Sequence, residues 1–189
     1  LKVLNLDGFA GIKTLPMAIG SLPDLHTLHM RECEGLEHLP VTVGKLRKMT
    51  TLNMTSCKEL LELPAAIGSL TALKTLYVGY NNQLTELPAA IGSLAALTRL
   101  DVSENQLTEL PTAIGSLTAL TTLRVSGNPL QLPPFAVAER GPADVRAFFD
   151  DLRAGTAVAR TCMLVLLGDA EMGKTSLLNG LLNDCTPDP

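Results

Sequence analysis

An eight-residue run near the end of the chain has the composition and spacing of a phosphate-binding loop. It fits the pattern G-x-x-x-x-G-K-[ST] and consists of Gly168, Asp169, Ala170, Glu171, Met172, Gly173, Lys174 and Thr175. In such a loop, successive backbone N–H groups and the positive end of the following helix hold the phosphates. Glycine permits the close approach of the backbone that a Cβ atom would block. We therefore expect these residues and Ser176 to bind a nucleotide.

Two side chains of this run would act on the nucleotide directly. Lys174 would reach the β- and γ-phosphate oxygens, and the Thr175 hydroxyl would bind Mg²⁺. The backbone N–H of Ser176 would meet the α-phosphate. Asp169 and Glu171 are expected to use only their backbone amides, with their side chains turned outward. No residue of the chain is assigned a catalytic role.

The flanking residues predict the elements that must position this loop. Residues 161–167 form a short apolar run, typical of a strand buried on both faces of a parallel sheet. Residues 175–183 place leucines at helical spacing. The order strand, loop, helix is the context that supports the motif. Because the sequence ends soon after this helix, we predict no nucleotide hydrolysis by residues 1–189 alone.

Most of the chain before the loop is an internal repeat. Aligned on Leu-x-x-Leu-x-Leu, it falls into six units that start at Leu1, Leu25, Met49, Leu73, Leu97 and Leu120, with a spacing of 24 residues four times and then 23. Leu-Pro and Ile-Gly steps recur in register. A single unit cannot bury its apolar face, so the units must stack. The pattern is that of the leucine-rich repeat and resembles the L-P-x-x-I-G-x-L variety of Ras-associated and plant intracellular repeat proteins.

These patterns predict an α/β fold. A leucine-rich-repeat solenoid, with a curved parallel sheet and short helical turns on its convex side, is followed by the start of a P-loop NTPase fold. Inward residues such as Leu100 and Val102 alternate along each strand. Each repeated Pro should lie in the first helical turn, where its missing N–H costs nothing. Each repeated Gly should end that turn in a left-handed conformation.

One column after the strands should stack as a ladder of inward-bonding side chains. Its members are Phe9, Cys33, Cys57, Asn81, Asn105 and Asn128. Asn would bond to backbone groups of the turn, and a Cys thiol can replace it as a weak donor. Cys33 and Cys57 should lie about 5 Å apart, at the spacing of neighbouring strands. That distance permits a disulfide, but two buried free thiols are the favoured reading for a protein of the reducing cytosol. Phe9 is assigned no role.

The strand residues between the buried leucines should line the concave face. They are mostly polar and vary between units, whereas the scaffold is nearly repetitive. This variation favours a surface that binds a protein partner, with candidate residues His29, Arg31, Tyr77, Arg99, Asp101 and Arg124. The alternative is a solvated strand face rich in Thr, because Thr favours strands.

The repeat period breaks after residue 128. We expect three parts: six repeats over 1–128, a cap and linker over 129–159, and an incomplete nucleotide domain over 160–189. Phe135, Phe148 and Phe149 suit a cap on the last open core, and residues 143–153 should form a helix with one apolar face. The alternative is that this helix already belongs to the nucleotide domain.

Composition excludes several other functions. The net charge is −4, and no basic block or aromatic stripe suggests nucleic acid. No apolar run is long enough to span a membrane. The three His lie in one unit without partners at metal-ligand spacing. Because the chain begins inside a repeat and without Met, we expect it to be part of a longer protein. The four Cys have neither the spacing of a secreted disulfide scaffold nor that of a metal pair, which favours a cytoplasmic protein, as does the nucleotide loop.

The segment Leu-x-Gly-Asp-x-x-x-Gly-Lys-Thr-Ser-Leu-Leu-Asn, placed after repeats and a helical linker, resembles the Roco family. The resemblance implies a Ras-like GTPase domain (Roc) that binds GTP or GDP with Mg²⁺, signal transduction, and dimerisation through a COR domain that these residues do not include. It also implies that Lys174 and Thr175 serve phosphate and magnesium. Two alternatives stay open: an immune-receptor-type NTPase, which places its nucleotide domain before the repeats, and a repeat adaptor without nucleotide function.

Overall fold

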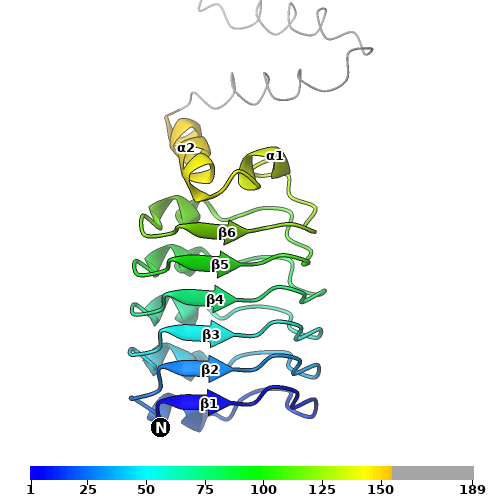
Figure 1. Ribbon diagram of the computed structural model, residues 1–189, viewed down its shortest axis with the longest axis vertical. Coiled ribbons are helices and arrows are strands. Elements are labelled where there is room, and N and C mark those ends of the chain that lie inside the picture. Colours follow the sequence, from blue (N-terminus) through cyan, green and yellow to red (C-terminus); the bar gives the residue numbers. More distant parts are fainter. Residues whose placement is uncertain (155–189) are drawn as a thin grey trace, which may run out of the picture. The chain divides into compact units, whose positions relative to one another are not determined.

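The computed structural model of this chain describes residues 1–154, and its main feature is a single parallel sheet (Figure 1). Six strands follow one another across the sheet in the order of the sequence. Each strand is three residues long, and the bounds are β1 (Val3–Asn5), β2 (Thr27–His29), β3 (Thr51–Asn53), β4 (Thr75–Tyr77), β5 (Arg99–Asp101) and β6 (Thr122–Arg124). The six predicted repeat units therefore each supply one strand.

The register of the sheet follows the sequence period. Leu28 pairs with Leu52, and Leu52 pairs with Leu76, one unit further along. Leu100 pairs with Leu123, at the shorter step of the last unit. These central leucines are buried, and the residues on either side of each stand on the opposite face of the sheet. The predicted alternation along the strands is confirmed.

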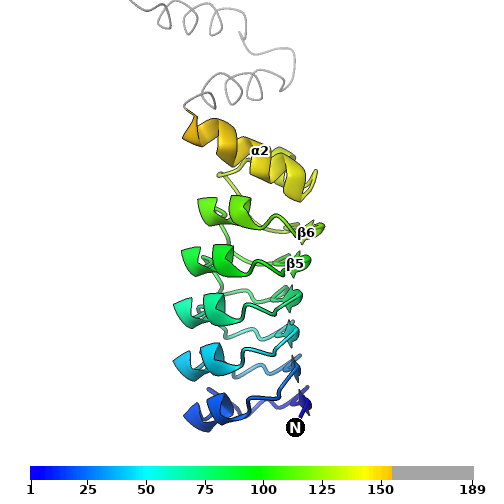
Figure 2. The same ribbon diagram turned by 90° about the vertical axis from the view of Figure 1, so that its left-hand side faces the viewer.

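A short helical turn follows each of the first five strands on the other side of the solenoid (Figure 2). All five are 3₁₀ helices of five residues, with bounds Met17–Ser21 (η1), Val41–Lys45 (η2), Ala65–Ser69 (η3), Ala89–Ser93 (η4) and Thr112–Ser116 (η5). The repeated Pro lies just before the turn, in an extended conformation, and its carbonyl accepts the first hydrogen bond, as from Ile67 N–H to Pro64 at 2.9 Å. Each proline is therefore the residue before the helical turn, and not the first residue within it as predicted.

The repeated glycines of the helical turns have a different cause from the one predicted. None of Gly20, Gly44, Gly68 and Gly92 has the positive φ of a left-handed residue. A Cβ atom on Gly44 would instead lie 2.7 Å from the carbonyl oxygen of Ala66 in the next unit. The left-handed assignment was wrong, because close packing of successive helical turns, rather than backbone conformation, excludes a side chain here.

Left-handed residues do recur, but each lies three residues after the end of a strand. The positions with positive φ in this column are Gly8, Glu32, Ser56, Tyr80, Glu104 and Gly127. Four of the six carry a side chain, although this conformation is unfavourable for any residue with a Cβ atom. Because glycine occupies only two of these six positions, the column was not predicted.

The predicted ladder of inward-bonding side chains is present. Asn105 donates to the carbonyl oxygens of Val78, Val102 and Ser103 at 2.8 to 3.1 Å. Asn128 makes the corresponding bonds one unit later, and Asn81 donates to the Val78 carbonyl oxygen. The ladder thus supplies side-chain donors to carbonyl groups near the strand ends, and the Ser103 carbonyl oxygen also accepts the backbone N–H of Tyr80.

Two thiols continue the ladder toward the start of the chain. The Cys33 thiol donates to the Leu6 carbonyl oxygen at 3.1 Å, and the Cys57 thiol donates to that of Met30 at 3.0 Å. Both cysteines are free and fully buried, as the favoured reading predicted. Burial raises the pKa of the Cys57 thiol to about 12 and also raises the pKa of Cys33.

Two helices, α1 (Phe135–Ala138) and α2 (Pro142–Arg153), follow the last strand. Val145 and Phe149 are fully buried in the same core as the repeats, and Phe148 packs edge-on against Phe149. The Arg146 guanidinium donates to the Leu117 carbonyl oxygen at 3.1 Å, which ties α2 to the end of η5. The helix predicted over 143–153 is thus observed, and it covers the open core of the last coil.

Phe135 differs from this expectation. It was predicted to help bury the last core, yet 38% of its surface is exposed. It is the first residue of α1 and lines a surface hollow together with Leu123 and Arg124. Among residues 1–154, no helix has the length and apolar character needed to cross a membrane.

Candidate functional site

Four of the six candidate partner-binding residues come together on the strand face, the surface formed by the outward residues of β1–β6. Tyr77, Arg99, Asp101 and Arg124 line a hollow of about 280 Å³, whose other lining residues are Leu100 and Thr122. The hollow spans β4, β5 and β6, because the parallel register places these residues side by side. The sequence variation predicted this surface, and the structure adds its concavity.

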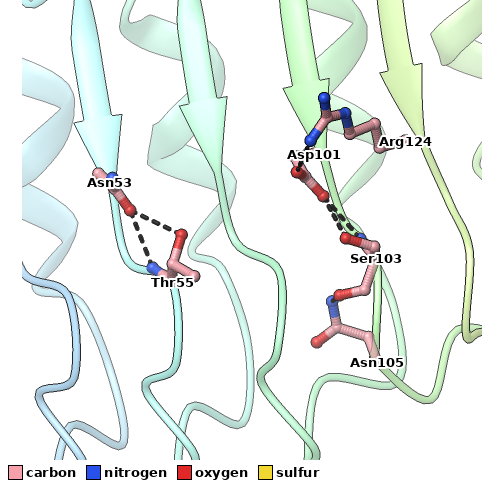
Figure 3. A network of polar contacts seen from close by, with 6 residues as sticks. All are labelled: Asn53, Thr55, Asp101, Ser103, Asn105 and Arg124. Carbon is pink, nitrogen blue, oxygen red and sulfur yellow. Dashed lines mark hydrogen bonds and ion pairs between the residues drawn. The ribbon is translucent and has the colours of Figure 1, made fainter.

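Asp101 is held in place by its own strand end (Figure 3). One of its carboxylate oxygens accepts hydrogen bonds from the backbone N–H and the hydroxyl of Ser103, and the other lies 3.7 Å from the Arg124 guanidinium. Asn53 accepts the same two bonds from Thr55 two units earlier. One oxygen of Asp101 therefore closes a local turn, and the other forms an ion pair with Arg124, whose side chain remains exposed.

The Arg99 side chain differs, because it is exposed and makes no hydrogen bond or ion pair within residues 1–154, whereas the Arg99 backbone N–H donates to the Lys74 carbonyl oxygen. Elsewhere on the surface, charged side chains bridge neighbouring units. Lys13 bonds to Glu37 at 2.8 Å, and Lys48 bonds to Asp24 at 2.6 Å. These hydrogen bonds and the charges lower the pKa of Glu37 and of Asp24. Arg99 thus adds a positive charge to the hollow that no described residue balances.

A second hollow, of about 450 Å³, adjoins the first and shares Asp101 and Arg124 with it. Its rim includes Tyr80 and Phe135, which are 56% and 38% exposed, and Glu139. Leu123 and Val125 supply buried apolar residues to its lining. Sequence reasoning missed this hollow, because Tyr80 lies in the turn after β4 while Phe135 lies in α1, far away in the sequence.

His29 and Arg31 do not join either hollow. His29 pairs in register with Asn5 and Asn53, toward the other end of the sheet. The backbone N–H of Arg31 donates to the Asp7 carboxylate at 2.7 Å. These two candidates therefore belong to a different part of the strand face from the other four.

The predicted nucleotide-binding residues, Gly168 to Ser176, lie outside the described residues, as do the strand over 161–167 and the helix over 175–183. Within residues 1–154, no group of three His, Cys, Asp or Glu side chains could hold a metal ion. The candidate site that the structure describes is therefore the pair of hollows on the strand face.

Comparison with known proteins supports the repeat assignment. A family model described as "Leucine-rich repeat region" matches residues 1–81, and one described as "Leucine rich repeat" matches residues 71–130. No curated protein sequence matches the chain significantly.

Solved structures of leucine-rich repeat proteins resemble this chain. A leucine-rich repeat protein of Leptospira interrogans is 30% identical, with a TM-score of 0.51 over 68% of this chain and 41% of its own. The functional domain of InlJ from Listeria monocytogenes, described as including a cysteine ladder, is 27% identical, with a TM-score of 0.57 over 69% of this chain and 26% of its own.

The leucine-rich repeat domain of the type III effector XopL is also 27% identical, with a TM-score of 0.54 over 61% of this chain and 39% of its own. This chain thus spans less than half the length of each of these proteins. The family matches, the six-stranded parallel sheet and these likenesses agree, and residues 1–130 are a leucine-rich repeat region.

Proposed function

We propose that the repeat region binds a protein partner through the strand face at β4–β6. The observation that carries this proposal is the hollow lined by Tyr77, Arg99, Asp101 and Arg124, because non-repeating, partly charged side chains gather there on an otherwise regular scaffold. Repeat solenoids offer such extended faces for recognition, since their buried columns leave the outward positions free to vary.

Partner capture tests this proposal. The chain with Arg99→Glu and Arg124→Glu should retain less of its partner from an extract of the source cell than the unchanged chain. Arg47→Glu is the matched control, because Arg47 is exposed on the connection after η2, away from the strand face. Equal capture by all three proteins would refute the strand face as the binding surface.

We also propose that the region belongs to a Roco-like GTP-binding signalling protein of the cytoplasm. The support is the loop from Gly168 to Thr175 and its position after the repeats. Lys174 would bind the β- and γ-phosphates and Thr175 would bind Mg²⁺, with GTP or GDP as the nucleotide. A repeat adaptor without nucleotide function is the alternative, and it shares the partner-binding surface.

Nucleotide binding separates these two readings. A fluorescent GTP analogue should bind the longer protein with Mg²⁺, and Lys174→Ala should weaken its affinity by at least about tenfold, since a hydrogen bond to a charged group is lost. Lys58→Ala, which removes an exposed lysine of the repeats, should leave affinity unchanged. Unchanged affinity after Lys174→Ala would favour the adaptor.

A further inference from the structure

The two hollows on the strand face are arranged along the direction of the strands. The first reaches the strand-start positions of Arg99 and Thr122, and the second reaches Ser103 and Ser126, four residues further along the same units. At about 3.3 Å per residue, the two hollows together extend for roughly 13 Å. Their centres are therefore separated by about two residues of an extended peptide.

The charges of the first hollow favour an acidic group. Arg99 and Arg124 both line it, and the carboxylate of Asp101 is engaged by Ser103 and Arg124. The guanidinium of Arg99 has no hydrogen bond or ion pair within the described part of the chain, and Arg99 is exposed. A guanidinium group binds a carboxylate through two parallel hydrogen bonds, and few other groups match its geometry.

The second hollow favours a large apolar side chain. The exposed rings of Tyr80 and Phe135 are on its rim, and Leu123 and Val125 add buried apolar residues. Exposed aromatic rings around a hollow are typical of the places where a partner inserts an anchoring side chain. Glu139 stands on the same rim, so a second acidic group would be repelled there.

We propose that this part of the strand face binds an extended segment of a partner protein in which an acidic residue is followed or preceded, two positions away, by an aromatic or large aliphatic residue. The acidic side chain binds Arg99 and Arg124, and the apolar side chain enters the hollow between Tyr80 and Phe135. The proposal rests on the proposed partner-binding function and gives its ligand a definite chemistry.

Selection from a displayed library of random heptapeptides on the immobilised full chain tests this inference. We expect enrichment of sequences that combine Asp or Glu with Phe, Tyr, Trp or Leu two positions away. Binding of a selected peptide to the chain with Arg99→Glu should weaken by at least about tenfold, since charged hydrogen bonds are lost. Arg47→Glu should leave this binding unchanged.

A second pair of variants tests the apolar half of the site without risk to folding. Tyr80 has a φ of 60°, so Tyr80→Gly removes the ring and relieves the backbone. Ser56→Gly makes the same backbone change at a φ of 65°, one unit before Tyr80, and Ser56 lines neither hollow. Tyr80→Gly should weaken peptide binding at least about fivefold, as expected when one interface aromatic is truncated, and Ser56→Gly should not.

Three outcomes would overturn the inference: no enrichment, enrichment without the acidic and apolar pair, or equal binding by the unchanged chain and by Arg99→Glu. None of them decides the proposed function, which the capture of the natural partner tests separately. If that capture depends on Arg99 and Arg124 while the selected peptides lack the pair, the strand face binds its partner through another chemistry.

Discussion

At the scale of single residues, side chains buried near the strand ends bond to the backbone of neighbouring units. Asn105 donates to three carbonyl oxygens, and the thiols of Cys33 and Cys57 donate to one each. These residues could be predicted from the sequence, because they recur at the repeat period. Their partners follow from the same period, since each bonds to backbone at or near a strand end.

Asn105→Ala should lower the free energy of unfolding by about 2 kcal/mol, because it removes three buried hydrogen bonds to backbone carbonyl oxygens. Asn82→Ala is the control, since Asn82 is exposed beside the same ladder. Urea unfolding followed by circular dichroism measures both changes. Similar values for the two variants would show that the ladder adds nothing to stability.

The raised pKa of Cys57 predicts a dependence of stability on alkaline pH. The folded chain keeps this proton up to a pKa of about 12, whereas an unfolded thiol loses it near 8.5. The free energy of unfolding is therefore unaffected by this thiol below about pH 8.5. Above that pH it falls by about 1.4 kcal/mol per pH unit, because the unfolded chain loses the proton that the folded chain keeps.

Cys57→Ser keeps a hydroxyl donor for the Met30 carbonyl oxygen and does not titrate in this range. We expect urea midpoints measured from pH 7.5 to 10 to fall less steeply for this variant than for the unchanged chain. Parallel curves would contradict the assigned burial of the thiol.

At the scale of elements, the helical turns pack so closely that glycine is required between them. A sequence pattern can locate a Gly that recurs from one repeat to the next. It cannot show whether that Gly is required by close packing or by a left-handed backbone, because both favour glycine. We predicted that a left-handed backbone requires these glycines, whereas the structure shows that close packing against the next unit requires them. The positions that do have a left-handed backbone could not be predicted, since four of the six hold residues other than glycine: Glu32, Ser56, Tyr80 and Glu104.

Gly68→Ala should destabilise the fold by about 1 to 3 kcal/mol, the range for overpacking. The added Cβ atom would lie 2.9 Å from that of Ala90 and closer still to its carbonyl oxygen. Gly11→Ala is the matched control, because nothing lies within 4 Å of a Cβ atom there. Thermal unfolding of both variants distinguishes packing from backbone entropy. An equal shift in Tm for Gly68→Ala and Gly11→Ala would contradict the packing explanation.

At the scale of the whole molecule, the repeat period predicted the six strands, their order and their register. It also predicted that Tyr77, Arg99, Asp101 and Arg124 share one face, because parallel strands in register place equivalent positions side by side. The second hollow could not be predicted, since it joins a turn of one unit to a helix of the cap. Residues that are distant in sequence and outside the repeat alignment have no periodic signal to connect them.

The central claim is that a partner binds the strand face at β4–β6. It is tested most directly by a photo-reactive amino acid placed at Thr122, which lines the first hollow, or at Thr71, which is exposed on the connection after η3. Irradiation with the captured partner should give a covalent product from position 122 and none from position 71. A product from position 71 alone would contradict the claim and place the partner on the helical side.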